Sequence, residues 1–116
     1  MSRVPGAPQA VETAVGRVMT VARHPRAGRE LGALGVALFR GKDVLEIGSG
    51  DGRLSLDLAR VARRVVGVEP SADAVAASAR RAAALGLRNV RFEVGAAQHL
   101  DLGRRRFDVA VFTWSL

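Results

Sequence analysis

The stretch that decides the fold is Val44-Leu45-Glu46-Ile47-Gly48-Ser49-Gly50-Asp51-Gly52-Arg53. Its first residues form a short, largely apolar run, which is typical of a strand buried inside a parallel sheet. Helical spacing of apolar residues begins directly after the three glycines. Glycines let the backbone turn tightly and let a ligand lie against it. Because ligands of open α/β sheets bind at the carboxyl ends of the strands, the sequence predicts a ligand site at this loop.

Strand and helix patterns alternate along the chain after this loop. We expect, in order, a helix over 53–63, a strand over 64–68, a helix over 71–85, a strand over 89–94, a loop or short helix over 95–106 and a strand over 107–112. Ser71 is suited to cap its helix, and Gly86 is suited to end it. This alternation predicts an α/β fold in which a parallel sheet has flanking helices and right-handed crossovers.

The part of the chain before the loop shows helical spacing in two places. Apolar residues recur at helical intervals over 9–23, where Pro25 ends the pattern, and again over 28–40. We therefore expect a leader with helices over residues 1–40 and a cofactor-binding domain over residues 41–116.

Composition limits the classes of protein to consider. The chain has 116 residues, 48% hydrophobic and 25% charged, which is typical of one globular domain and not of a disordered or fibrous chain. It has no cysteine, which excludes disulfides and thiolate metal sites. No apolar run approaches the roughly 20 residues that span a membrane, and the first residues do not resemble a secretory signal. We therefore expect a cytoplasmic protein with no membrane partner.

Arginine carries nearly all of the positive charge. The formal net charge is +7, and Lys42 is the only lysine. The arginines are spread through every segment, and the chain has only four phenylalanines and one tryptophan. Because a nucleic-acid surface concentrates basic residues and offers rings for stacking, this pattern argues against nucleic acid as a partner. The run Arg104-Arg105-Arg106 is interpreted as a solvated loop.

A carboxylate after the next strand points to a nucleoside ligand. Glu69 lies 19 residues beyond Gly50, at a position where a carboxylate can accept both hydroxyls of a ribose. The alternatives are a plain tight turn and a solvated acid at a strand end. The glycine spacing differs from that of dinucleotide sites, because Gly52 comes one position early.

The acids around the loop favour a cationic ligand. A pyrophosphate binds best where no anions are near, whereas Glu46 precedes the loop and Asp51 lies within it. S-adenosylmethionine carries an ammonium and a sulfonium and has no phosphate, so it suits these carboxylates. An NAD(P)-binding domain is the weaker alternative.

With these motifs, residues 43–116 resemble the N-terminal half of a class I S-adenosylmethionine-dependent methyltransferase. The segments similar to the family's successive motifs are Val44–Gly52, Val66–Ser71, Asn89–Leu100 and Phe107–Phe112. The run into Trp114-Ser115-Leu116 most resembles small-molecule methyltransferases of the quinone-biosynthesis type. The resemblance implies a Rossmann-like sheet, S-adenosylmethionine as cofactor and a small molecule as methyl acceptor.

The resemblance also implies a role for each matching residue. The residues whose backbone would hold the methionine part are Gly48, Ser49, Gly50 and Gly52. Glu46 would position the ammonium group, directly or through water. Glu69 would hold the ribose, with Pro70 beside the adenine. Ala96 and Ala97 take the place where the family commonly has an acid and a small residue. The acid's hydrogen bond to the adenine would be missing here, which lowers affinity by up to about tenfold.

Neither a catalytic residue nor a metal site is identified. Methyl transfer mainly requires that the acceptor be aligned with the sulfonium, and it requires a base only where the acceptor loses a proton. His24 and His99 are interpreted as surface residues, Trp114 as a core or edge aromatic and Asp108 as structural.

The family's sheet has seven strands, whereas this chain reaches only the fourth. By the family's strand order, 3-2-1-4, residues 107–112 would form an exposed apolar edge, which invites pairing with another chain. We therefore expect a Rossmann-like sheet truncated after the fourth strand, in a truncated gene product or a fragment. The alternatives are a small self-contained cofactor module and an inactive chain that associates with a complete methyltransferase, or with itself, through this edge.

Overall fold

The computed structural model describes Val11, residues 14–23 and residues 33–115. The elements in chain order are β1 (Val15–Arg23), α2 (Ala33–Phe39), β2 (Asp43–Ile47), α3 (Arg53–Ala59), β3 (Arg64–Glu69), α4 (Ala72–Ala84), β4 (Val90–Val94), the short 3-10 helix η2 (Ala97–His99) and β5 (Phe107–Ser115). From β2 onward this is the predicted alternation. The helix predicted over 53–63 ends earlier, at Ala59, and the last strand extends past residue 112.

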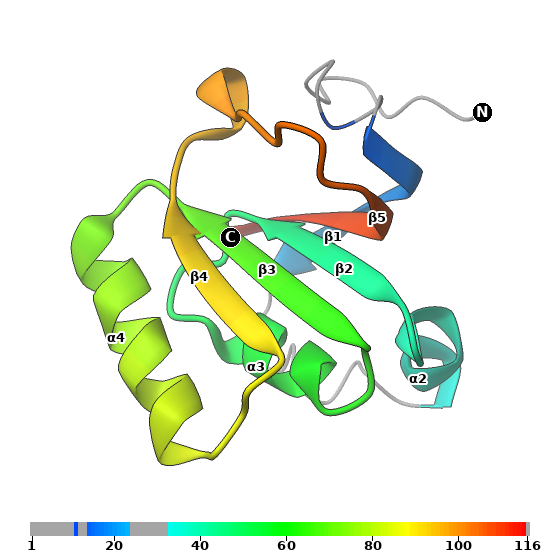
Figure 1. The fold of residues 1–116 in the computed structure, drawn as a ribbon, viewed down its shortest axis with the longest axis horizontal. Coiled ribbons are helices and arrows are strands. Elements are labelled where there is room, and N and C mark those ends of the chain that lie inside the picture. Colours follow the sequence, from blue (N-terminus) through cyan, green and yellow to red (C-terminus); the bar gives the residue numbers. More distant parts are fainter. Residues whose placement is uncertain (1–10, 12–13, 24–32, 116) are drawn as a thin grey trace.

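The strands form one five-stranded sheet in the order β1-β5-β2-β3-β4 (Figure 1). Every neighbouring pair is parallel. The central part, β5-β2-β3-β4, is the predicted order of the four motif strands read in reverse. The α/β prediction of a Rossmann-like parallel sheet with flanking helices is therefore confirmed.

The helix predicted over 9–23 is wrong over residues 15–23, which form β1. This strand pairs in parallel with β5, from Val15 opposite Phe107 to Arg23 opposite Ser115. The segment contains three valines and one threonine, which are β-branched and favour strands over helices. A free edge of β5 also supplies hydrogen-bond partners along its whole length, which a pattern confined to residues 9–23 cannot reveal.

Because β1 pairs with it, β5 is not an edge strand. It pairs with β1 on one side and with β2 on the other, so the prediction of an exposed edge at 107–112 is wrong. The edges of the sheet are β1 and β4. Self-association through 107–112 therefore loses its structural basis, while the division of the chain into 1–40 and 41–116 stays a prediction.

Residues of the central strands β2, β3 and β5 supply two core clusters, one on each face of the sheet. In β2, Val44 packs toward α3, whereas Leu45 and Ile47 face the opposite side. The buried residues on the helix-covered face are Phe39, Val44, Leu54, Leu58, Ala59, Ala62, Val65, Val109 and Val111. Those on the opposite face are Val11, Ala14, Val15, Leu45, Ile47, Val66, Val68, Leu102, Phe107 and Ala110. Both faces of the central strands are therefore buried, as the apolar strand sequences predict.

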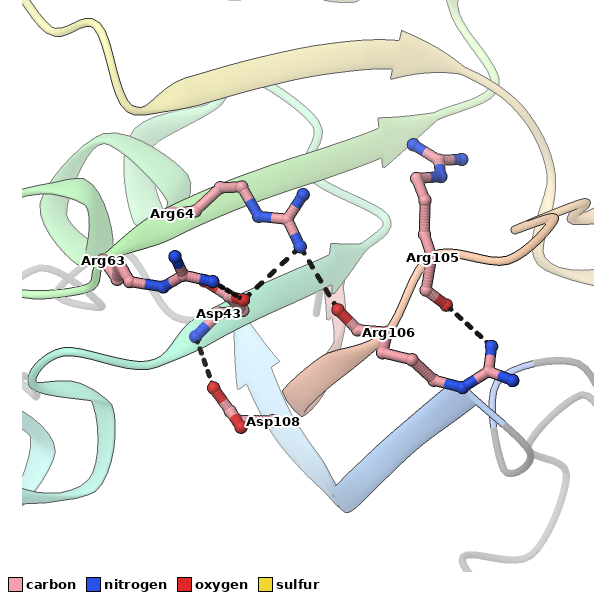
Figure 2. A network of polar contacts seen from close by, with 6 residues as sticks. All are labelled: Asp43, Arg63, Arg64, Arg105, Arg106 and Asp108. Atoms are coloured by element: carbon pink, nitrogen blue, oxygen red, sulfur yellow. Dashed lines mark hydrogen bonds and ion pairs between the residues drawn. The ribbon is translucent and has the colours of Figure 1, made fainter.

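Charged side chains join the amino ends of β2, β3 and β5 (Figure 2). The Asp43 carboxylate accepts a hydrogen bond from Arg63 and lies 3.5 Å from a guanidinium nitrogen of Arg64. The backbone N–H of Asp43 donates to the carboxylate of Asp108 at 2.8 Å, which confirms the structural interpretation of Asp108. Arg64 also donates to the carbonyl of Arg106 at 3.2 Å. These bonds align the strands at the end of the sheet opposite the glycine loop.

We expect Asp43→Asn to destabilise the fold by about 1 kcal/mol at pH 7, because the paired Arg63 side chain is 69% exposed and water weakens the pair. The hydrogen bond from Arg63 lowers the pKa of the Asp43 carboxyl below its usual 3.8. Its contribution to stability is therefore complete above about pH 4 and is lost as the pH falls through the lower, folded-state pKa. Urea unfolding from pH 7 to pH 2 should show that the unfolding free energies of the parent and the Asp43→Asn variant converge in acid. A difference between these free energies that stays constant over this pH range would contradict the ionic role of Asp43.

Candidate cofactor-binding site

The loop after β2 requires glycine at three positions. Gly48, Gly50 and Gly52 have φ angles of 84°, 55° and 80°, a left-handed backbone that residues with a Cβ atom rarely adopt. The N–H groups of Gly48 and Ser49 donate to the Val68 carbonyl at 2.8 and 3.1 Å. The glycine pattern therefore reflects a backbone path that holds the loop at the carboxyl ends of β2 and β3.

The end of the loop packs directly against α4 and β4. A Cβ atom at Gly52 would lie 2.5 Å from the Ser78 hydroxyl oxygen, 2.8 Å from the Ser78 Cβ and 3.2 Å from the Phe92 ring. Arg81, also on α4, donates to the Asp51 carbonyl at 2.6 Å. The loop is therefore fixed both to the sheet and to the following helix.

Glu69 joins the glycine loop to the start of α4. One oxygen of its carboxylate accepts from the N–H of Gly50 at 3.0 Å, and the other accepts from the N–H of Ser71 at 2.9 Å. The backbone carbonyl of Glu69 accepts from the N–H of Gly95 at 3.0 Å. Glu69 therefore contacts the segments that follow β2, β3 and β4. Each carboxylate oxygen offers about two acceptor positions, so capacity for two hydroxyl donors is left, as a ribose requires.

Glu46 lies inside the core. It has no exposed surface, and its carboxylate accepts a hydrogen bond from the Ser55 hydroxyl of α3. From this position it supports the strand that leads into the loop. Its predicted contact with a ligand ammonium group stays a prediction.

The segment expected beside an adenine lies at the same end of the sheet. Pro70 is exposed, and Ala96 and Ala97 are half-buried at the start of η2. In the loop after η2, the Asp101 carboxylate accepts from the N–H of Gly103 at 2.9 Å. The hydrogen bond between Gly95 and Glu69 ties this segment to the end of β3.

The structure also places the other residues singled out from the sequence. His99 is exposed at the end of η2, Trp114 belongs to β5, and His24 lies outside the described residues. Within the described ranges, no group of three His, Cys, Asp or Glu side chains could hold a metal ion. Each helix in those ranges is too short or too polar to span a lipid bilayer. A cytoplasmic location stays a prediction.

Sequence reasoning missed the residues that support the loop from the helices. The Ser55 hydroxyl on α3 donates to the Glu46 carboxylate of β2. On α4, Arg81 donates to the Asp51 carbonyl of the loop, and Ser78 lies close to Gly52. The only available signal was a pair of buried serines in helices whose other inward residues are apolar. The hydroxyls of Ser49 and Ser78 are buried and have no hydrogen-bond partner in the described part of the protein.

These features define an α/β domain whose candidate ligand site lies at the carboxyl ends of β2, β3 and β4. A family model described as a methyltransferase domain matches residues 44–116, so the chain belongs to this methyltransferase domain family. The cofactor of the family is S-adenosylmethionine. The match starts within β2 and includes every loop of the site.

Solved structures of other methyltransferases share this fold. The CcbJ methyltransferase from Streptomyces caelestis is 34% identical, with a TM-score of 0.67 over 79% of this chain and 39% of its own. Phosphoethanolamine N-methyltransferase 1 from Haemonchus contortus, in complex with phosphoethanolamine and S-adenosylhomocysteine, is 27% identical, with a TM-score of 0.60 over 74% of this chain and 20% of its own. A dimethyladenosine transferase from Plasmodium falciparum, 23% identical, matches with a TM-score of 0.66 over 78% of this chain and 32% of its own, and shows the fold alone.

The chain spans less than half the length of each of these proteins. The name of the CcbJ methyltransferase gives no methyl acceptor, and that of the Haemonchus contortus enzyme gives phosphoethanolamine. The likeness therefore supports the methyltransferase family and its cofactor, and leaves the acceptor to be argued from the site.

Proposed function

We propose that this chain binds S-adenosylmethionine at the carboxyl ends of β2, β3 and β4 and supports methyl transfer to a small-molecule acceptor. The observation that carries the proposal is the Glu69 carboxylate, which bridges Gly50 and Ser71 and retains acceptor capacity for two hydroxyls. A rigid glycine loop lies directly beside it. This combination suits a ligand in which a ribose is joined to an amino-acid part that lies against backbone without side chains.

The residues of the site would bind and orient the cofactor, and none of them has to exchange a proton. When bound, the cofactor supplies a methyl group on an electrophilic sulfonium. The loop backbone from Gly48 to Gly52 holds the methionine part, and Glu69 fixes the ribose. Ala96 and Ala97 leave room beside the adenine. Held in this way, the cofactor meets an acceptor in a fixed direction, which is the main requirement of methyl transfer.

The charge around the site favours a small acceptor over a nucleic acid. Four acids, Glu46, Asp51, Glu69 and Asp73, lie at or beside the loops of this end. The two arginines beside them are Arg53, whose guanidinium lies 3.7 Å from the Asp51 carboxylate, and Arg81, which donates to the Asp51 backbone carbonyl. Such an end attracts the cationic cofactor and repels a phosphate backbone. The Haemonchus contortus enzyme, crystallised with phosphoethanolamine, is a family relative with a small acceptor.

Calorimetric titration of the 116-residue chain should give heat with S-adenosylmethionine and with S-adenosylhomocysteine, and none with NAD⁺. Binding of NAD⁺ in their place would refute the cofactor assignment. For the acceptor, methyl-labelled cofactor is incubated with the chain and either a small-molecule extract or total RNA. Label in the low-mass fraction supports the proposed acceptor class, and label in RNA contradicts it.

A further inference from the structure

A cavity of about 460 Å³ lies at the amino ends of β3 and β4, away from the cofactor loops. Five of the residues that line it are arginines: Arg63, Arg64, Arg88, Arg91 and Arg105. The volume is in the range of small-molecule sites, about 300–1,000 Å³. A concentration of guanidinium groups in one cavity is the signature of a site for anions.

The strand register explains why these residues meet. Val66 of β3 is paired with Arg91 of β4, and Val68 is paired with Glu93. Since alternate residues of a strand share a face, Arg91 and Glu93 lie on the face opposite Phe92, whose ring packs toward α3 and α4. Arg105 reaches this face from the segment before β5 and donates to Glu93 at 2.6 Å.

The amino-terminal end of the cavity is separate from the cofactor site. Arg64, the first residue of β3, is five residues before Glu69, the last residue of the same strand, which corresponds to about 17 Å at about 3.3 Å per residue. The lining also extends to Glu93, which is paired with Val68 beside Glu69. A compact ligand held at Arg64 and Arg88 would therefore not reach Glu69.

The positive charge of the cavity is only partly compensated. Arg105 is paired with Glu93, and Arg63 and Arg64 share the single carboxylate of Asp43 (Figure 2). Arg88 and Arg91 form no ion pair with any residue that the structure describes. Five guanidinium groups therefore face two carboxylates, so the net charge around the cavity is positive.

We propose that this cavity binds a compact, multiply charged phosphate ligand. Guanidinium groups bind phosphate oxygens through paired, charge-assisted hydrogen bonds, and Arg88 and Arg91 have their donors available for this. The lining includes no aromatic side chain. Stacking of bases is a main source of affinity for single-stranded nucleic acid, so its absence favours a polyphosphate over an RNA segment.

Calorimetric titration of the full chain with inorganic tripolyphosphate at low ionic strength tests this proposal. Arg88→Gln and Arg91→Gln should each weaken binding about fivefold to tenfold, and the double variant should weaken it further. Arg80→Gln removes the same charge from an exposed position on α4 that does not line the cavity, and should change binding by less than about twofold. Circular dichroism confirms that each variant is folded.

The outcomes separate this site from the cofactor site. Titration of the same variants with S-adenosylhomocysteine should give unchanged affinity, whether or not tripolyphosphate binds. Absence of heat with tripolyphosphate would overturn the proposal. Equal weakening by Arg80→Gln would also overturn it, because binding would then follow net charge alone. A short RNA that binds more tightly and is not displaced by tripolyphosphate would assign the surface to nucleic acid instead.

Discussion

Replacing Glu69 with alanine is expected to weaken the binding of S-adenosylhomocysteine by more than about a hundredfold. A hydrogen bond to a charged acceptor contributes about 1.5–3 kcal/mol, and a ribose would lose two of them. The substitution also releases the N–H groups of Gly50 and Ser71, which the carboxylate now holds at 3.0 and 2.9 Å. The ligand would then have to order a loop that is already ordered in the parent chain.

Two further variants divide this effect into its parts. Glu69→Gln keeps one oxygen acceptor and removes the charge, so we expect an intermediate loss of about tenfold. Glu93→Ala removes the same charge from the neighbouring strand, where the carboxylate binds Arg105 and not a loop. It should leave the calorimetric affinity within about twofold of the parent value. Retention of affinity by Glu69→Ala would show that the nucleoside lies elsewhere.

The strands and the glycine loop could be predicted because their signals are local. An apolar run, three glycines and a following helical pattern are contiguous, and the φ angles of Gly48, Gly50 and Gly52 show why the pattern has this spacing. The N-cap of α4 is equally local: the Ser71 hydroxyl accepts from the N–H of Ala74, and Gly86 follows the helix with a φ of 69°.

The position of β1 could not be read from its own residues. Its apolar spacing fits a helix, yet the segment pairs with β5 because that strand otherwise presents a free edge. The hydrogen bonds that decide between the two structures come from residues 107–115, far away in sequence. Local propensity is a weak guide where such a partner is available.

The arginines illustrate the same limit for function. In the sequence they are dispersed, and this dispersion, together with the few aromatic residues, argues against a nucleic-acid surface. The sheet brings Arg64 and Arg91 to neighbouring strands, and the segment before β5 adds Arg105. Charge that is scattered along a chain can therefore be concentrated in space, because parallel strands place their amino ends side by side.

The second large effect is expected at Gly52. Gly52→Ala should destabilise the fold by about 3 kcal/mol, from two sources. A non-glycine residue in the left-handed region costs about 1–2 kcal/mol, and Gly52 has a φ of 80°. Overpacking a tight contact costs about 1–3 kcal/mol more, and the new Cβ would lie 2.8 Å from the Ser78 Cβ. Because Gly52 is the N-cap residue of α3 and the last glycine of the loop, the strain should also shift the loop and weaken cofactor binding.

Two comparisons separate the backbone source from the packing source in chemical unfolding experiments. Gly86→Ala has a similar φ of 69° and nothing within 4 Å of the added Cβ, so it should cost only about 1 kcal/mol. Ser78→Gly removes both atoms that the new methyl group would approach most closely. In the double variant, Gly52→Ala should therefore cost about 1–2 kcal/mol less than it does alone. Equal costs in the two backgrounds would mean that α4 moves to accommodate the methyl group. The packing of Ser78 would then not help to define the shape of the loop, which would be held by its hydrogen bonds to Glu69, Val68 and Arg81.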